Sequence, residues 1–124
     1  MSNLDQSISH LTTEAMIFGD KMDKCSESIK KVEESLKLLN INLSFYFSFT
    51  DSNDRKYGIS WTQHGEKEEY RLCSERLDDI KARKPLIEQK LGLRLTVSTH
   101  LVDFVNAFKE HIKQIRINIE ESGI

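Results

Sequence analysis

The first third of this chain carries one apolar stripe that advances by alternating steps of four and three residues. The members of the stripe are Leu4, Ile8, Leu11, Ala15, Phe18, Met22, Cys25, Ile29, Val32, Leu36 and Leu39. This spacing places them on one face of an α-helix, as in coiled coils. It predicts a single long helix over residues 1–40. Because exposed apolar side chains must be covered, the stripe also predicts association with something equally long.

The start of this helix carries capping chemistry, since Ser2 is followed three residues later by Asp5. Asn40 is suited to end the helix. Gly19 is the weak point, because glycine in a helix interior costs about 1 kcal/mol. The apolar spacing continues across Gly19, which favours one helix over a kinked pair.

Residues 41–74 change to a period of two, which is typical of half-buried strands. Apolar side chains alternate with polar ones in the order Ile41, Leu43, Phe45, Phe47 and Phe49. After a turn at residues 51–54, a second strand is predicted around Tyr57, Ile59 and Trp61. A short third strand is predicted from Lys67 to Cys73. We therefore expect a three-stranded antiparallel meander with one apolar face.

Residues 75–124 are predicted to be helical. Pro85 interrupts the helical spacing of Leu77, Ile80, Ile87 and Leu91, which predicts an irregular helical connection. Residues 93–98 fit either a strand or a helix, and we favour the helix. A last long helix is predicted from Thr99 to about Glu121. The sequence thus predicts one α+β domain over residues 1–124, with both long helices covering one face of the sheet.

The two long helices differ in length, because the first stripe spans about 36 residues and the last about 20. At ~1.5 Å per residue, about 20 Å of the first stripe lies beyond the reach of the last helix. We therefore expect a homodimer that forms through the first helix. The predicted self-association residues are Leu4, Ile8, Leu11, Ala15, Phe18 and Met22. A helix of another protein is the competing occupant, and the parallel or antiparallel direction stays open.

The charge balance argues against a nucleic-acid role, since 18 basic and 20 acidic residues give a formal net charge of −2. Positive charge gathers only around Arg76, Lys81, Arg83, Lys84, Lys90 and Arg94. Asp78, Asp79 and Glu88 interrupt that cluster. Weak single-strand binding through the aromatic sheet is kept as the third hypothesis, although the phenylalanine spacing favours a buried role.

Cysteine usage and hydropathy predict a cytoplasmic location. Cys25 and Cys73 match no metal or redox spacing, and Cys25 belongs to the apolar stripe. The first residues do not follow the pattern of a signal peptide, and no apolar run is long enough to cross a membrane.

The sequence indicates no catalytic, cofactor or metal site, and we expect no enzyme activity and no small-molecule substrate. Asp51–Asp54 is interpreted as a hairpin turn, because Lys56 and Thr62 stand where a calcium loop requires Gly and Glu. The four histidines, His10, His64, His100 and His111, lack the spacing of a zinc helix. The acidic group Glu66, Glu68 and Glu69 is interpreted as a solvated edge.

These observations lead to the hypothesis of a dimeric protein-interaction module that acts as an adaptor, regulator or inhibitor. The alternative is a small secretion-type chaperone that shields a segment of a partner protein. In size and mild acidity the chain resembles type III secretion chaperones, which usually hold more strands after a middle helix. A strand at residues 93–98 would support that alternative, and a helix there would count against it.

Overall fold

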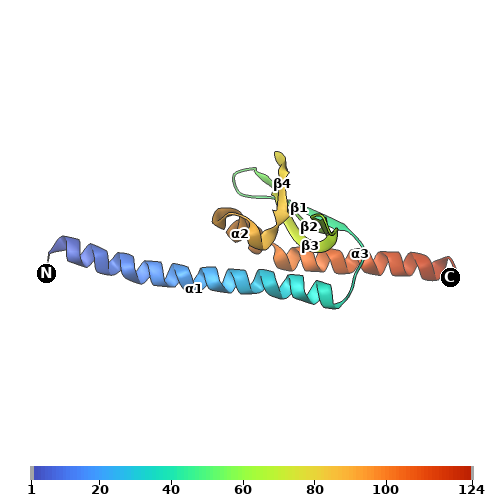
Figure 1. The fold of residues 1–124 in the computed structure, drawn as a ribbon, viewed down its shortest axis with the longest axis horizontal. Helices are drawn as coiled ribbons and strands as arrows, with labels where there is room; N and C mark the ends of the chain where they lie inside the picture. The colour runs from blue at the N-terminus through green and yellow to red at the C-terminus, as the bar shows by residue number, and fades with distance from the viewer. Residues whose placement is uncertain (1, 124) are drawn as a thin grey trace.

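The computed structural model describes residues 2–123, apart from the side chains of residues 79–82. The chain is an α+β protein, as predicted. Its elements in order are α1 (Asn3–Leu38), β1 (Phe45–Thr50), β2 (Lys56–His64), β3 (Glu69–Arg76), β4 (Asp79–Pro85), the 3-10 helix η1 (Leu86–Glu88), α2 (Leu91–Ser98) and α3 (Leu101–Glu121). The two long helices run side by side along the sheet, and the N-terminal half of α1 extends far past the other elements (Figure 1).

Helix α1 is one uninterrupted helix, as the spacing of its apolar residues predicts. The hydroxyl oxygen of Ser2 accepts a hydrogen bond from the backbone N–H of Asp5 at 3.1 Å, which caps the first turn. The helix passes through Gly19 without a break (Figure 1). Just after the helix, Asn40 has φ of 52°, a left-handed conformation that asparagine tolerates well and that commonly ends helices.

Strands β1, β2 and β3 form the predicted antiparallel meander. Phe45, Phe47 and Phe49 pair with Trp61, Ile59 and Tyr57 in that order, so these six side chains share one face of the sheet. Strand β1 begins at Phe45 and not at Ile41. The carbonyl of Ile41 instead accepts a hydrogen bond at 2.9 Å from the indole N–H of Trp61, which holds the incoming chain against the core.

The prediction of a three-stranded sheet was wrong, because residues 79–85 form a fourth strand and not part of a helical connection. Strand β4 pairs with β3 in antiparallel fashion, with a register irregularity between Ser74 and Arg76. Pro85 is its last residue, and an edge strand tolerates a proline that a central strand would not. The backbone N–H and C=O groups at the open edge of β3 can pair with residues 79–85. The hydrogen bonds gained there outweigh the weak helical preference of this segment.

Three helices cover the apolar face of the sheet. Phe104 and Phe108 of α3 are buried, and the ring of Phe45 stacks on Phe108 with centroids 4.9 Å apart. The second half of α1 contributes Ile29 and Leu36 to the same core. Residues 93–98 belong to α2, as we favoured, and this outcome counts against the secretion-type chaperone. The core therefore lies between the sheet and the helices, and the phenylalanines of β1 are structural.

Candidate functional site

The apolar stripe of α1 is covered by its own chain only along the C-terminal half of the helix. Every residue from Ser2 to Lys21 is exposed. The large side chains of the predicted self-association stripe keep half or more of their surface open, at 68% for Leu4, 51% for Ile8, 68% for Leu11 and 50% for Phe18. Ala15 is likewise exposed, and Met22 is the first half-buried member. The structure thus leaves the first five predicted residues uncovered, and Met22 lies where cover by the chain begins.

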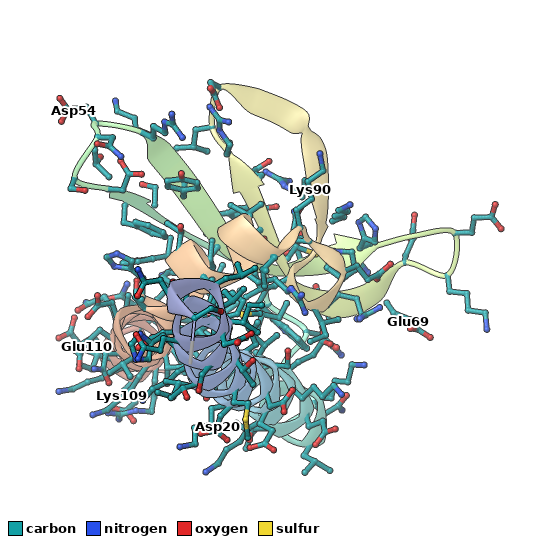
Figure 2. The ribbon with its side chains drawn as sticks, turned by 90° about the vertical axis from the view of Figure 1, so that its left-hand side faces the viewer. Asp20, Asp54, Glu69, Lys90, Lys109 and Glu110 are labelled. Atoms are coloured by element: carbon teal, nitrogen blue, oxygen red, sulfur yellow. The ribbon has the colours of Figure 1, made fainter. Side chains whose placement is uncertain are left out.

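The polar side of the projecting helix is distinct from the stripe. Asp20 lies on the side of α1 that faces away from the sheet (Figure 2), where its carboxylate is 3.4 Å from the ammonium of Lys24. Met16 and Ile17 are also exposed, but helical geometry of about 100° per residue places them outside the stripe. The free half of α1 is therefore amphipathic, with its main apolar face continuous with the buried face further along.

Cover by the chain itself begins at Cys25. The sulfur of Cys25 lies 2.9 Å from the hydroxyl of Ser98 in α2, and Ile29 one turn later is almost completely buried. Only the part of α1 from about Met22 onward packs against other elements of the chain. The exposed portion is about 20 residues, or ~30 Å at 1.5 Å per residue.

A buried carboxylate fixes α1 to the sheet. Glu33 accepts two hydrogen bonds from the guanidinium of Arg71, at 2.9 and 3.2 Å, and one from the backbone N–H of Leu72 at 2.8 Å. The Leu72 amide belongs to the part of β3 that extends beyond β4, so Glu33 satisfies a strand edge that would otherwise lack a partner. The hydrogen bonds to Glu33 raise the pKa of Arg71. This contact sets the direction in which the free half of α1 projects.

The other face of the sheet is closed by a layer of polar side chains. The guanidinium of Arg83 in β4 forms a bidentate pair with Glu75, at 2.6 and 3.1 Å. It also lies 5.2 Å from the centre of the Tyr46 ring in β1, so it reaches across the two central strands. Small side chains beneath, including the fully buried Cys73, leave room for this arrangement. Burial raises the pKa of the Cys73 thiol to about 11, which makes it a poor nucleophile.

The remaining sequence candidates take structural positions. The carboxylate of Asp51 accepts hydrogen bonds from the N–H groups of Arg55 and Asn53, both at 2.9 Å, as expected for a hairpin turn. The Arg55 amide is the main cause of the lowered pKa of Asp51. Glu66 and Glu68 are exposed in the β2–β3 turn, and Glu69 is exposed where β3 begins. In the part of the chain that is described, no cluster of three or more metal-ligating side chains occurs.

A basic groove is the feature that sequence reasoning missed. Arg55, Arg76, Lys84 and Lys90 line one side of the molecule together, whereas Arg94 turns toward Ser26 of α1. Of the acidic residues that interrupt the basic cluster in sequence, Asp78 lines the groove and pairs with Arg76, whereas Glu88 lies 3.9 Å from Arg71. The side chains of Asp79 and Lys81 lie outside the described residues. The local density of Lys and Arg between residues 81 and 90 was the available signal.

Comparison of the chain with protein families, with curated proteins and with solved structures finds no match in any of the three. Among residues 2–123, no helix combines the length and the apolar character needed to cross a membrane. The exposed stripe of α1 is the main feature of the candidate functional site.

Proposed function

We propose that this protein is a cytoplasmic, non-enzymatic interaction module that works as a homodimer through the free half of α1. In this proposal the dimer acts as an adaptor, regulator or inhibitor by contact with another protein. The observation that carries it is the exposure of Leu4, Ile8, Leu11 and Phe18 on one face of a helix that projects alone. The two free thiols, Cys25 and Cys73, favour a reducing compartment.

A second copy of the chain is the occupant that best fits this stripe. Full burial of a large apolar side chain contributes roughly 1.5–3 kcal/mol, so recovering the open half of four such side chains is worth about 3–6 kcal/mol per subunit. Two subunits contribute about twice that amount, against a cost of association of ~4–15 kcal/mol. A second copy offers an uncovered segment of the same length, which a two-fold axis can pair with the first. With the smallest association cost the net gain reaches about 8 kcal/mol, so micromolar affinity is the tightest that these four side chains alone support.

Light scattering coupled to size-exclusion chromatography tests the proposal directly. The wild-type chain is expected to show twice the 14.4 kDa mass of one chain at concentrations of roughly 10–100 µM. Leu11→Glu places a charge in the middle of the stripe and is expected to shift the protein to the monomer. Thr13→Glu is the matched control, because Thr13 is exposed on the opposite side of α1.

Neither substitution removes a buried contact within the subunit, so the helix content of both variants should equal that of the wild type. A wild-type protein that remains monomeric at the highest concentration contradicts the proposal. A dimer that Leu11→Glu leaves intact also contradicts it, since dimerisation would then use another surface.

A further inference from the structure

The basic groove lies on the sheet-and-α2 side of the molecule, away from the stripe of α1. It encloses about 900 Å³ between the ends of β2, β3 and β4 and the first turns of α2. Its described basic lining residues are Arg55, Arg76, Arg83, Lys84 and Lys90. In Figure 2 Lys90 lies above α2, beside the β3–β4 hairpin. Residues from four elements therefore bring positive charge to one place in a chain whose net charge is −2.

The described lining of the groove carries more basic than acidic side chains. Among side chains that the structure describes, Arg55, Lys84 and Lys90 form no ion pair. Arg76 pairs with Asp78 at 2.7 Å, but both side chains are largely exposed and such a pair contributes little. The guanidinium of Arg83 pairs with Glu75 and lies over the Tyr46 ring. The described lining thus holds five basic side chains and one carboxylate, that of Asp78, and the Asp51 carboxylate acts electrostatically on Arg55.

The first turn of α2 adds to this potential. Lys90 is the N-cap residue, no side chain caps the helix there, and its first turn holds no acidic residue. The unpaired N–H groups of a helix N-terminus carry partial positive charge. The α2 N-terminus therefore reinforces the side-chain charges that line the same groove, and it favours carboxylate groups near Lys90.

The residues at the floor of the groove favour a peptide over a nucleic acid as the ligand. Leu93 of α2 is half-buried there and offers apolar surface. Tyr57 is the aromatic residue of the lining, but it is only 5% exposed and its ring stacks on Phe49 at 5.4 Å. A single-stranded nucleic acid needs an exposed aromatic face on which bases can stack. The lining instead matches carboxylates along the rim and an aliphatic side chain over Leu93.

We propose that the groove between the hairpin ends and α2 binds an acidic segment of a partner protein, with an aliphatic side chain of that segment over Leu93. This inference does not rest on dimerisation, because none of the groove residues lies on α1. It assigns the partner contact to a surface of its own, and the charge complementarity of the lining carries it.

Fluorescence anisotropy with the full-length protein tests this inference. The probe is a short fluorescein-labelled peptide of glutamates that flank two leucines, and the control probe replaces each glutamate with glutamine. We expect the acidic peptide to bind at low salt and to weaken as salt rises, while the glutamine peptide does not bind. Lys90→Glu and Arg55→Glu should each weaken binding roughly ten-fold, because each reverses an exposed charge on the groove.

Two further variants keep the result specific. Lys90→Arg should retain binding, because it preserves the charge. Lys113→Glu on α3 should leave binding unchanged, because Lys113 is exposed away from the groove. The inference is overturned if the acidic peptide does not bind at low salt, or if Lys113→Glu weakens binding as much as Lys90→Glu. It is also overturned if an oligothymidine of similar length binds more tightly than the peptide. Leu11→Glu, which addresses the dimer, should not change the affinity of the groove.

Discussion

Replacing Glu33 by glutamine should destabilise the protein more than any other single charge removal on α1. Glu33 is the buried carboxylate whose hydrogen bonds join α1 to β3, and its side chain is 10% exposed. Glutamine has nearly the same size but no charge. Its single carbonyl oxygen cannot accept all three hydrogen bonds. Its amide N–H₂ group is a donor, so it cannot accept a hydrogen bond from Arg71 or from the Leu72 amide. The substitution therefore leaves Arg71 with only the exposed carboxylate of Glu88, at 3.9 Å, as a counter-charge.

The magnitude follows from the number and the burial of the contacts. Removing one partner of a buried ion pair costs ~3–5 kcal/mol, because the remaining charge is left without compensation. Arg71 keeps 24% of its side-chain surface open, so water replaces part of the lost interaction. We therefore expect a loss of about 2–3 kcal/mol in the free energy of unfolding. For a chain of 124 residues this lowers the melting temperature by about 10 °C.

Urea unfolding followed by circular dichroism at one protein concentration measures this loss. Glu34→Gln is the matched control, since Glu34 is the next residue on α1 and is exposed. The control should change the free energy of unfolding by less than about 0.5 kcal/mol. A loss for Glu33→Gln as small as that of the control would refute the reasoning, because the Glu33 carboxylate would then not hold α1 against the sheet.

Three other perturbations have defined outcomes. Burial raises the pKa of Cys73 to about 11 from an ordinary value of 9.0, so the unfolded thiol ionises first and stability is lost as the pH rises between these values. Wild-type protein should lose about 2–3 kcal/mol more than Cys73→Ala over that range in urea titrations. Gly19→Ala should add roughly 0.5–1 kcal/mol to local helix stability, because a Cβ there meets no atom within 4 Å. Slower amide hydrogen exchange in α1 would show this gain, and unchanged exchange would contradict it. Removing residues 1–21 should leave the melting temperature of the monomer unchanged, because residues 2–21 bury no side chain, and a large drop would show that they support the core.

The elements with long and regular spacing were predictable from the sequence. The stripe of α1 repeats across its whole length, so local propensity and amphipathic spacing agree, and Gly19 does not change the outcome. The phenylalanines of β1 alternate with polar residues, which correctly placed them in the core against α3. In both segments the spacing of apolar residues in the sequence matches the face that the folded chain buries.

Strand β4 and the basic groove were not predictable in this way. Residues 79–85 form a strand because β3 presents an open edge, and that edge exists only once the meander has formed. The groove combines Arg55 from the β1–β2 hairpin, Arg76 from β3 and Lys90 from the start of α2. Their convergence depends on the register of three strands and on the packing of α2.

Periodicity along the chain alone determined that this protein has two long amphipathic helices around an antiparallel sheet, since burial of one face needs only a repeat in the sequence. Tertiary structure decided how far the first stripe is covered, because the extent of cover depends on where α2 and the sheet end along α1. It also decided which charges meet, because residues up to 19 positions apart become neighbours when strands pair. The exposed half of α1 and the basic groove are both products of that second step.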